Sequence, residues 1–497
     1  MSHATRNKNH REPLDASALD ALGVVYTGIA IDSRKVEPGD LFLAYPGEIS
    51  DGRRYIAEAL AAGAVAVLWD EADFRWDARW RVPNLAVRDL RHQAGFIASR
   101  FFGEPSRHLW VAGVTGTNGK TSCSHWIAEA LAQLGRPAAV IGTLGSGFPG
   151  ALDAAANTTP DPVSLHRQLD GLRRRGARAV AMEVSSHGLE QGRVNGVAFD
   201  TALFTNLSRD HLDYHGTMQA YGDAKARLFS WPQLRTAVVN LDDEFGARLA
   251  ARIDRSQTHL IGYGFGKGEI AGHKLDLTTR GLKLEITTPW GEAELKSPLL
   301  GRFNAHNLLG VLGALVGADV ALTEAAAALC NIAPVRGRMQ TLQLENAPLV
   351  VIDYAHTPDA LEKALQTLRD LLPPGARLHC VFGCGGDRDQ GKRPLMGEVA
   401  TRIAHRCVIT SDNPRSENPR AIIEQIVAGA HPNYHVEADR TAAIFDALAN
   451  ASIGDVVLIA GKGHETYQEI GTQRLAYDDV EVARELLDRL AGAARHV

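Results

Sequence analysis

An apolar segment that runs directly into a glycine-bracketed loop constrains the fold of this chain more than any other feature. Residues 111–114 are interpreted as a strand and residues 115–119 as the loop, and Lys120 and Thr121 open the next helix. Glycines let backbone N–H groups approach phosphate oxygens, a helix N-terminus favours anions, a lysine adds positive charge, and a threonine hydroxyl can bind Mg²⁺. The segment therefore predicts a strand–loop–helix unit that binds a nucleoside triphosphate.

The match to the standard phosphate loop is incomplete. The first glycine of that motif falls where this chain has Val114, and the chain instead has Gly113 and Gly116 nearby. The alternative is a glycine-rich turn without a ligand. The strand, the lysine and the threonine together favour the phosphate loop.

Length and composition favour an α/β protein of several domains. The chain has 497 residues, of which 45% are hydrophobic and 22% charged, with 48 glycines and a net charge of −5. A chain of this length exceeds a single core and predicts about three domains. The small net charge gives no general attraction to nucleic acid, so we expect small-molecule partners and no nucleic-acid partner.

The sequence predicts no membrane insertion. Residues 1–13 are polar and basic, unlike a signal peptide, and the longest apolar stretch, residues 308–322, contains Asp319 and is short for a membrane-spanning helix. The five cysteines are widely spaced and odd in number, which favours reduced thiols. Cys380 and Cys384 could bind zinc, but no second cysteine or histidine pair completes a tetrahedral site. We therefore expect a cytoplasmic protein.

Three blocks of alternating strand and helix pattern predict domains at residues 1–106, 107–335 and 336–497. Polar residues around Pro105 mark the first boundary, and a break near Pro334 marks the second. The central block is predicted to be a nucleotide-binding domain. Its expected buried strands are short apolar runs at residues 138–142, 179–182, 201–205, 237–240 and 259–262.

The third block contains four strands that end in polar or glycine-rich loops. Ligands of open α/β sheets bind at the carboxyl ends of strands, so we expect these loops to converge on one crevice. The loops are residues 353–358, 383–393, 411–419 and 461–465.

Two strands of the central block are followed by side chains that suit metal binding. Glu183 and His211 at neighbouring strand ends could hold a second Mg²⁺ near a γ-phosphate. The alternatives remain open: Glu183 as a helix cap or surface carboxylate, and His211 as an ordinary loop histidine. On composition alone, Lys225 is a solvated helix lysine.

Six motifs of the chain resemble those of the Mur ligases of peptidoglycan synthesis, and the resemblance covers nearly the whole chain beyond its polar start. It is strongest to the members that add 2,6-diaminopimelate to UDP-N-acetylmuramoyl-L-alanyl-D-glutamate. It implies an N-terminal UDP-sugar-binding α/β domain, a central ATP-binding parallel-sheet domain with a P-loop, and a C-terminal amino-acid-binding Rossmann-like domain. The motifs are Thr-Gly-Thr-Asn-Gly-Lys-Thr at 115–121, Asn-Thr-Thr-Pro at 157–160, Glu-Val-Ser-Ser at 183–186, and residues 206–211, 301–307 and 461–465.

The resemblance implies an ATP-dependent amide ligase of peptidoglycan precursor synthesis, and hence of cell wall formation and division. The D-glutamate γ-carboxylate would take the γ-phosphoryl group of ATP, and an amine of meso-2,6-diaminopimelate would attack the acyl phosphate. Phosphorylation supplies a good leaving group and so splits one difficult step into two easier ones. We expect a monomer that uses Mg²⁺.

The resemblance also implies the residues of the ATP site. Two of them come from the third block, which implies a domain closure that excludes water from the acyl phosphate. Expected ATP contacts are Gly116, Thr117, Asn118, Gly119, Lys120, Thr121, Ser122, Asn304, Asn307, Arg338 and Asp353. Expected catalytic residues are Lys120, Glu183, His211 and Lys225, and expected Mg²⁺ ligands are Thr121, Glu183, His211 and Lys225. Lys225 would be an N6-carboxylated lysine, because Mg²⁺ would repel a plain ammonium.

The substrate residues implied by the resemblance fall into three groups. The nucleotide-sugar group is Ile31, Ser33, Glu48, Ile49 and Ser50, although residues 32–34 could also be an ordinary turn. The peptide group, suited to carboxylate and amide recognition, is Asn157, Thr158, Thr159, Ser185, Gln191 and Arg193. The amino-acid group is Arg388, Asp412, Asn413, Pro414, Arg415, Gly461 and Glu465.

The expected selectivity for meso-diaminopimelate over lysine depends on Arg415. Its planar guanidinium can bind the distal carboxylate of meso-diaminopimelate with two hydrogen bonds, and lysine has no such carboxylate. The alternative for residues 412–415 is an Asn-Pro turn with a surface arginine. The competing functions are a related ligase that adds L-lysine, a dipeptide or a folate glutamate, and a nucleotide-binding regulator without turnover.

Overall fold

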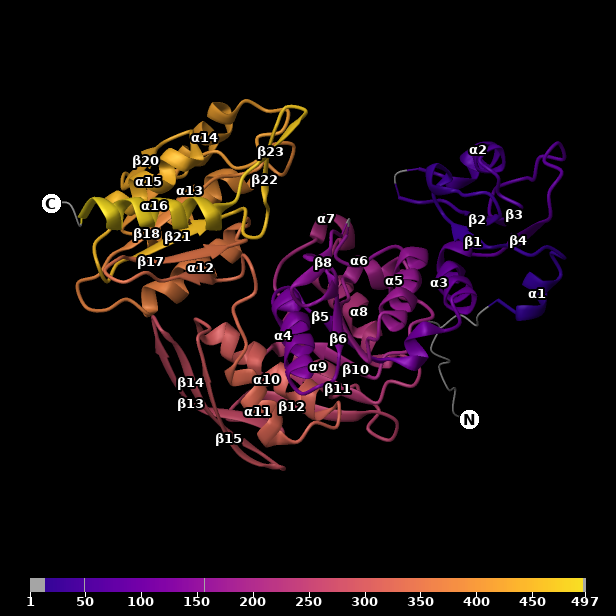
Figure 1. The fold of residues 1–497 in the computed structure, drawn as a ribbon, viewed down its shortest axis with the longest axis horizontal. Helices are drawn as coiled ribbons and strands as arrows, with labels where there is room; N and C mark the ends of the chain where they lie inside the picture. The colour runs from indigo at the N-terminus through magenta and orange to yellow at the C-terminus, as the bar shows by residue number, and fades with distance from the viewer. Residues whose placement is uncertain (1–13, 49, 156, 495–497) are drawn as a thin grey trace. The chain divides into compact units, whose positions relative to one another are not determined.

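The computed structural model describes residues 14–48, 50–155 and 157–494, and it contains two compact units (Figure 1). Unit 1 comprises Met1–Gly272, Thr287–Ala293 and His306–Leu329, and unit 2 comprises His273–Ile286, Glu294–Ala305 and Cys330–Val497. Both are built on parallel sheets flanked by helices. The α/β fold class is confirmed.

The first part of unit 1 is a small parallel sheet in the order β1-β2-β3-β4. Strand β2 is buried on both faces: Leu41 and Leu43 pack with α3, and Phe42 and Ala44 pack with α2. The strands are β1 (Gly28–Ala30), β2 (Asp40–Ala44), β3 (Ala66–Asp70) and β4 (Asn84–Val87). The helices are α1 (Ala16–Asp20), η1 (Ser33–Lys35), η2 (Gly52–Tyr55), α2 (Ile56–Ala61), α3 (Leu90–Phe101) and η3 (Pro105–His108).

A larger sheet forms the centre of unit 1, in the order β12-β11-β10-β5-β9-β6-β7-β8. Pairing is parallel from β12 to β6 and antiparallel from β6 to β8. The five apolar runs predicted as strands are β6, β9, β10, β11 and β12. The bounds are β5 (Trp110–Thr115), β6 (Ala138–Gly142), β7 (Gly145–Phe148), β8 (Ala151–Asp153), β9 (Ala179–Glu183), β10 (Thr201–Phe204), β11 (Thr236–Asn240) and β12 (His259–Phe265).

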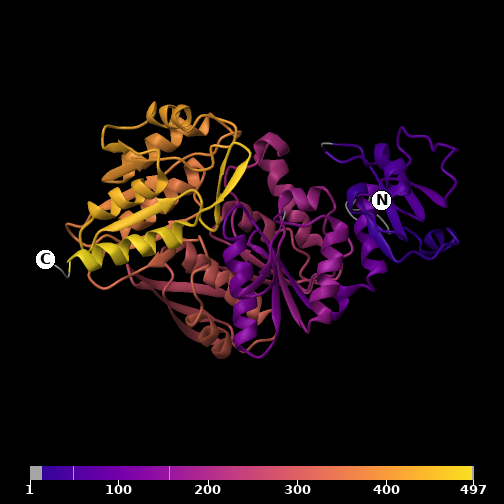
Figure 2. The ribbon, with the colours of Figure 1, turned by 45° about the horizontal axis from the view of Figure 1, so that its top comes forward.

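Helices cover both faces of this central sheet. Helix α4 packs along β5, β6 and β9, and Figure 2 shows the central sheet from a second direction. On the other face, Leu165 and Leu169 of α5 join Phe229 and Phe245 in one buried cluster. The helices are α4 (Lys120–Gln133), α5 (Pro162–Arg174), α6 (Ser186–Glu190), α7 (Leu212–His215), α8 (Met218–Ala226), η4 (Arg227–Ser230) and α9 (Glu244–Ala250).

The chain passes between the two units within residues 270–329. Glycines on α10 allow a close approach to the central sheet, since a Cβ at Gly313 would lie 2.7 Å from a methyl carbon of Val238. No strands or helices were predicted for this segment from the sequence. It contains β13 (Ile270–Thr278), β14 (Gly281–Thr288), β15 (Gly291–Ser297), α10 (Arg302–Val316) and α11 (Leu322–Cys330).

The C-terminal part of unit 2 has a six-stranded sheet in the order β16-β17-β21-β18-β19-β20, parallel except for β16. Helices α12, α13 and α14 pack on one face, and α15 and α16 on the other (Figure 1). The strands are β16 (Gln340–Leu342), β17 (Leu349–Asp353), β18 (Leu378–Phe382), β19 (Arg406–Ile409), β20 (Tyr434–Val436) and β21 (Val456–Ala460). The helices are α12 (Pro358–Asp370), α13 (Lys392–Ile403), α14 (Pro419–Val427), α15 (Arg440–Ala449) and α16 (Asp479–Ala494). A hairpin of β22 (Tyr467–Ile470) and β23 (Gln473–Ala476) precedes α16.

The boundaries placed at residues 106 and 335 stay predictions. Helix α3 and η3 both pack on α5 within unit 1, so the first and second blocks share one compact unit. Over the residues that the structure describes, no helix is both long enough and apolar enough to cross a membrane.

A buried ion pair joins the starts of α15 and α16. Arg440 Nε and Nη2 each lie 2.7 Å from a carboxylate oxygen of Asp479, and both side chains are 0% exposed. The same guanidinium donates to the carbonyls of Ser411 and Ala460 at 3.3 and 3.1 Å. Arg440 therefore holds the chain where β19 and β21 lead into the predicted site loops at residues 411–419 and 461–465.

We predict that Arg440→Leu lowers the free energy of unfolding in urea by about 3–5 kcal/mol, because Asp479 would be left charged and buried. The double variant Arg440→Leu/Asp479→Leu should recover much of this loss. The control is Arg402→Leu, which removes an exposed arginine paired with Glu362 and should cost less than about 1 kcal/mol. Equal losses in Arg440→Leu and the control would contradict the prediction.

Candidate active site

The loop after β5 is held in shape by the end of the neighbouring strand β10. A Cβ at Gly116 would lie 1.9 Å from Thr205 Oγ1, so only glycine fits there. Thr205 Oγ1 donates to the Asn118 carbonyl at 2.6 Å, and the Thr117 amide donates to the Asn206 carbonyl at 2.8 Å. The loop is therefore a fixed concavity that opens onto the N-terminus of α4, the arrangement that binds anions.

Two lysines meet at one carbonyl of this loop. Lys120 Nζ and Lys225 Nζ each lie 2.9 Å from the Gly116 carbonyl oxygen, and Lys120 also donates to the Thr117 carbonyl at 2.9 Å. Lys225 is 1% exposed, and its ammonium lies 4.2 Å from the ring centre of Tyr221. Burial, with Lys120 nearby, lowers the pKa of Lys225 well below its ordinary value. The structure thus contradicts the alternative of a solvated lysine.

Glu183 is the last residue of β9, and its buried carboxylate accepts three hydrogen bonds. It accepts from the Thr121 hydroxyl at 3.0 Å, from the Thr143 amide at 2.7 Å, and from the Thr143 hydroxyl at 3.1 Å. Its 1% exposure excludes the surface-carboxylate alternative. Glu183 and Thr121 therefore lie together at the start of α4.

His211 lies in a cluster of aromatic rings that includes His187 and Tyr221. Its ring is 4.8 Å from that of His187 and 5.9 Å from that of Tyr221, and its Nε2 is 3.4 Å from a carboxylate oxygen of Asp210. Burial lowers its pKa. The structure brings His211 to the same region as Lys225 but pairs it with Asp210.

The oxygen donors of this region suit Mg²⁺. Within residues 14–48, 50–155 and 157–494, no group of three or more His, Cys, Asp or Glu side chains is arranged to hold a metal ion. Mg²⁺ in phosphoryl-transfer sites usually takes one or two carboxylates together with substrate phosphates and water. Thr121 and Glu183 fit that ligand set.

Four of the six residues assigned to the peptide form one connected network. Thr159 Oγ1 donates to Ser185 Oγ at 3.0 Å, and Arg193 donates to the Thr159 carbonyl at 2.9 Å and to Gln191 Oε1 at 2.7 Å. Thr158 Oγ1 lies 3.0 Å from Thr143 Oγ1. Asn157 is exposed.

Tyr214 links the peptide network to the nucleotide-sugar residues. Its hydroxyl donates to Glu48 at 2.9 Å and accepts from Gln191 at 3.3 Å, and Glu48 also pairs with Arg91 at 3.0 Å. Ser33, in contrast, donates to Glu58 at 3.3 Å. Ile31 is half-buried and Ser50 is exposed. Ile49 lies outside the described residues.

The remaining residues assigned to ATP lie on α10, just before β16 and at the end of β17. Asn304 and Asn307 are buried one turn apart on α10, and Asn307 lies against the phosphate loop, because a Cβ at Gly119 would be 2.6 Å from its Oδ1. In unit 2, the Arg338 guanidinium lies 4.9 Å from the ring centre of Tyr354. Asp353 accepts from the Met339 amide at 2.8 Å, and burial raises its pKa.

All four predicted loops of unit 2 converge at the carboxyl edge of the sheet, where the Gly461 amide donates to the Asp353 carbonyl at 3.1 Å and Lys392 donates to the His356 carbonyl at 2.8 Å. Asn413 Nδ2 donates to Glu465 Oε2 at 2.8 Å, and a Cβ at Gly461 would lie 2.4 Å from Asp412 Oδ2. Asp412 and Asn413 are buried. Burial, with Asp412 nearby, raises the pKa of Glu465.

Arg415 and Arg388 flank the glycine loop after β18. A Cβ at Gly385 would be 3.0 Å from Arg415 Nη1 and 3.8 Å from Arg388 Cγ. Arg388 is exposed and donates to the Asp387 carbonyl at 3.1 Å. Pro414 is buried between the two loops, since its carbonyl would be 1.9 Å from a Cβ at Gly386. The seven residues assigned to the amino acid therefore lie in one region of unit 2.

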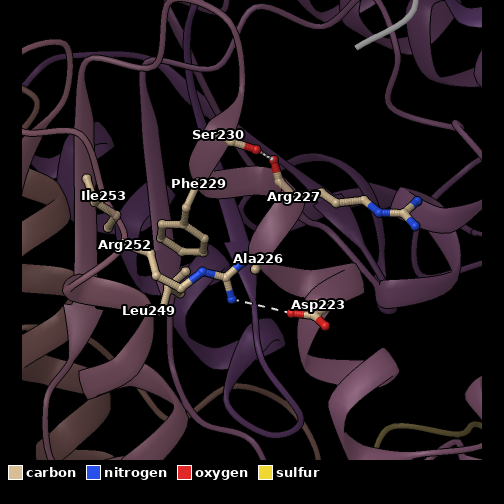
Figure 3. Close-up of a pocket in the computed structure, with 8 residues that line it drawn as sticks. All are labelled: Asp223, Ala226, Arg227, Phe229, Ser230, Leu249, Arg252 and Ile253. Carbon is tan, nitrogen blue, oxygen red and sulfur yellow. Dashed lines mark hydrogen bonds and ion pairs between the residues drawn. The ribbon is translucent and has the colours of Figure 1, made fainter. Parts of the chain in front are cut away.

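A pocket of about 440 Å³ lies elsewhere in unit 1, against α8, η4 and α9. Figure 3 shows the ion pair between Arg252 and Asp223 across it, at 3.3 Å, with Phe229 and Leu249 as apolar walls. None of the predicted site residues lines this pocket. It is therefore not the predicted active site.

Several residues of these networks were not singled out from the sequence. Lys462 is buried and donates to Asn413 Oδ1 at 3.0 Å, and its position between two glycines of a strand-end loop was an available signal. Thr143 and Tyr214 carried no comparable signal, because their partners are distant in sequence.

Three family models match successive parts of the chain. They are described as "Mur ligase family, catalytic domain" over residues 25–102, "Mur ligase middle domain" over residues 114–315, and "Mur ligase, glutamate ligase domain" over residues 337–463.

Named relatives match along nearly the whole chain. The UDP-N-acetylmuramoyl-L-alanyl-D-glutamate–2,6-diaminopimelate ligase of Chromobacterium violaceum is 56% identical, over 95% of this chain and 96% of its own length. The protein of the same name from Neisseria meningitidis serogroup A is 50% identical, over 92% of this chain and 94% of its own. A solved structure of a ligase with this name is 38% identical with a TM-score of 0.71, covering 94% of this chain and 95% of its own.

Proposed function

The chain belongs to the Mur ligase family, and from that premise we propose that it is an ATP-dependent ligase that joins meso-2,6-diaminopimelate to UDP-N-acetylmuramoyl-L-alanyl-D-glutamate. One observation carries the proposal: a phosphate loop with Lys120, Thr121 and Glu183 in place lies in a chain that matches ligases of that name over nearly its whole length. The products are ADP, phosphate and the extended peptide.

In the first step, an oxygen of the D-glutamate γ-carboxylate attacks the γ-phosphorus of ATP, and ADP leaves. The backbone amides of residues 116–122 and the Lys120 ammonium hold the phosphates as charge develops on them. Thr121 and Glu183 would hold Mg²⁺, which neutralises phosphate charge when bound. Thr159, Ser185 and Arg193 hold the peptide so that its carboxylate faces the γ-phosphate.

In the second step, the amine of diaminopimelate attacks the acyl carbon, inorganic phosphate leaves, and the amine loses a proton. Glu465 and Asp412 offer carboxylates to an ammonium group, and Arg415 offers a guanidinium to the distal carboxylate. Arg338 and Asp353 stay assigned to ATP. Cytoplasmic location, action as a monomer, and the boundaries at residues 106 and 335 are parts of the same proposal.

The experiment that tests the function is product mass spectrometry after incubation with ATP, the muramoyl dipeptide nucleotide, and equal diaminopimelate and lysine. The expected product carries diaminopimelate, and phosphate release requires both co-substrates. A lysine product would identify a different ligase, and phosphate release without either substrate would contradict ligation.

We predict that Lys120→Ala lowers kcat by roughly 10²–10³-fold or more, because it removes positive charge from the phosphates rather than core volume. Its melting temperature should stay close to that of the unaltered protein. The control is Lys363→Ala, an exposed helix lysine paired with Asp359, which should keep full activity. Normal turnover by folded Lys120→Ala would refute the phosphate-loop assignment.

We propose that Lys225 acts as a carboxylated Mg²⁺ ligand, since its buried ammonium otherwise shares the Gly116 carbonyl with Lys120. Its amine would take up CO₂ and release a proton to form the carbamate. Lys225→Ala should lose activity, and added formate or acetate should restore part of it. The same carboxylates should not rescue Lys120→Ala. An unaltered rate in Lys225→Ala, or an unmodified lysine in active crystals, would contradict this role.

We predict that Arg415→Ala raises the KM for diaminopimelate by about 30-fold or more, the result of truncating one partner of a desolvated, charge-assisted pair. The KM values for ATP and the nucleotide sugar should stay nearly constant, and lysine should not become a good substrate. Arg420→Ala, an exposed arginine on α14, is the control. An unchanged KM for diaminopimelate would contradict a role of Arg415 in substrate binding and favour the alternative of a surface arginine in a turn.

A further inference from the structure

The β22–β23 hairpin holds the loop that carries Arg415. Gln468 Nε2 donates to the Asp412 carbonyl at 2.6 Å, and the Glu469 amide donates to Asn413 Oδ1 at 3.0 Å. Both hairpin residues lie on β22, so one strand contacts successive residues of the loop. No role for this hairpin was predicted from the sequence.

The hairpin also fixes the backbone of Arg415. The Arg415 amide donates to the Glu469 carbonyl at 3.0 Å, and the Gly471 amide donates to the Arg415 carbonyl at 2.7 Å. Arg415 has φ of +50°, a left-handed conformation that is uncommon for residues other than glycine. The two hydrogen bonds hold this conformation and so determine the direction in which the side chain leaves the loop.

The guanidinium of Arg415 is held at two of its nitrogens. Its Nε lies 2.9 Å from Glu469 Oε2, and its Nη1 donates to the Gly386 carbonyl at 2.9 Å. The two side chains of the ion pair are only 22% and 32% exposed. Among the residues that the structure describes, nothing pairs with the two hydrogens of Nη2 or with the second hydrogen of Nη1, whereas Nε already faces the carboxylate of Glu469.

We propose that Glu469 is a specificity-determining positioning residue, which orients the Arg415 guanidinium so that its Nη groups receive the distal carboxylate of the amino-acid substrate. The proposal rests on the function proposed above. A substrate without that carboxylate, such as lysine, gains nothing from this orientation. Glu469 itself does not touch substrate.

The expected effect follows from the freedom of an arginine side chain. Without Glu469, the guanidinium must be ordered when the substrate binds, at a cost in conformational entropy. Glu469 also repels the substrate carboxylate, but solvent screens charges that are about a third exposed. We therefore expect the cost of ordering the guanidinium to outweigh the repulsion between Glu469 and the substrate carboxylate, so that loss of Glu469 weakens substrate binding.

The test is steady-state kinetics of the full chain with Glu469→Ala and Glu469→Gln. Both should raise the KM for meso-diaminopimelate roughly 3- to 10-fold, the effect of one side chain that is no longer pre-ordered. The kcat, the KM values for ATP and the nucleotide sugar, and kcat/KM for lysine should change less than about 2-fold. The control is Glu362→Ala, which removes the partner of Arg402 at 2.8 Å.

A double-mutant cycle separates positioning from a structural role. In an Arg415→Ala background, Glu469→Ala should have no further effect on the diaminopimelate KM, because Glu469 acts through Arg415. Additive effects, parallel changes in all three KM values, or a lowered diaminopimelate KM would each overturn the proposal. If the unaltered protein makes no diaminopimelate product, both the proposed function and the role of Glu469 fail. Failure of the Glu469 variants alone leaves that function standing.

Discussion

Parallel strands place all of their carboxyl ends at one edge of a sheet, and both units depend on this constraint. In unit 1 it gathers the phosphate loop after β5, Glu183 at the end of β9, and Thr205 just after β10. In unit 2 it gathers Asp412 after β19 and Gly461 after β21. The chemistry of each unit therefore lies in loops whose position is set by hydrogen bonding between strands.

At these edges, the loops are shaped by bonds to each other. The phosphate loop takes its form from Thr205 and Asn206, and the loop at residues 411–419 takes its form from the hairpin of β22 and β23. Loops that are fixed before a ligand binds need less ordering at that moment, which favours affinity and selectivity. The buried ion pair of Arg440 with Asp479 also ties the starts of α15 and α16 to this loop, through the hydrogen bond from Arg440 to the Ser411 carbonyl.

The strands of both parallel sheets that the sequence indicated are present, because buried parallel strands are short, continuous apolar runs. Strands β13 to β15 were missed because the predicted strands were continuous apolar runs, whereas these three strands alternate polar and apolar residues. Among the site residues, Lys120 and Glu183 follow from local pattern and strand ends. Their roles, like those of all site residues, are still proposals.

By itself, the sequence determined the fold class, the phosphate loop and, through resemblance, the family, because these depend on residues close together in the chain. Only the tertiary structure decided which groups share a partner. Lys120 and Lys225 meet at the Gly116 carbonyl, Tyr214 joins Glu48 to Gln191, and Glu469 pairs with Arg415. Most of these contacts join residues far apart in sequence, and their geometry depends on strand order and loop conformation, which no local pattern encodes.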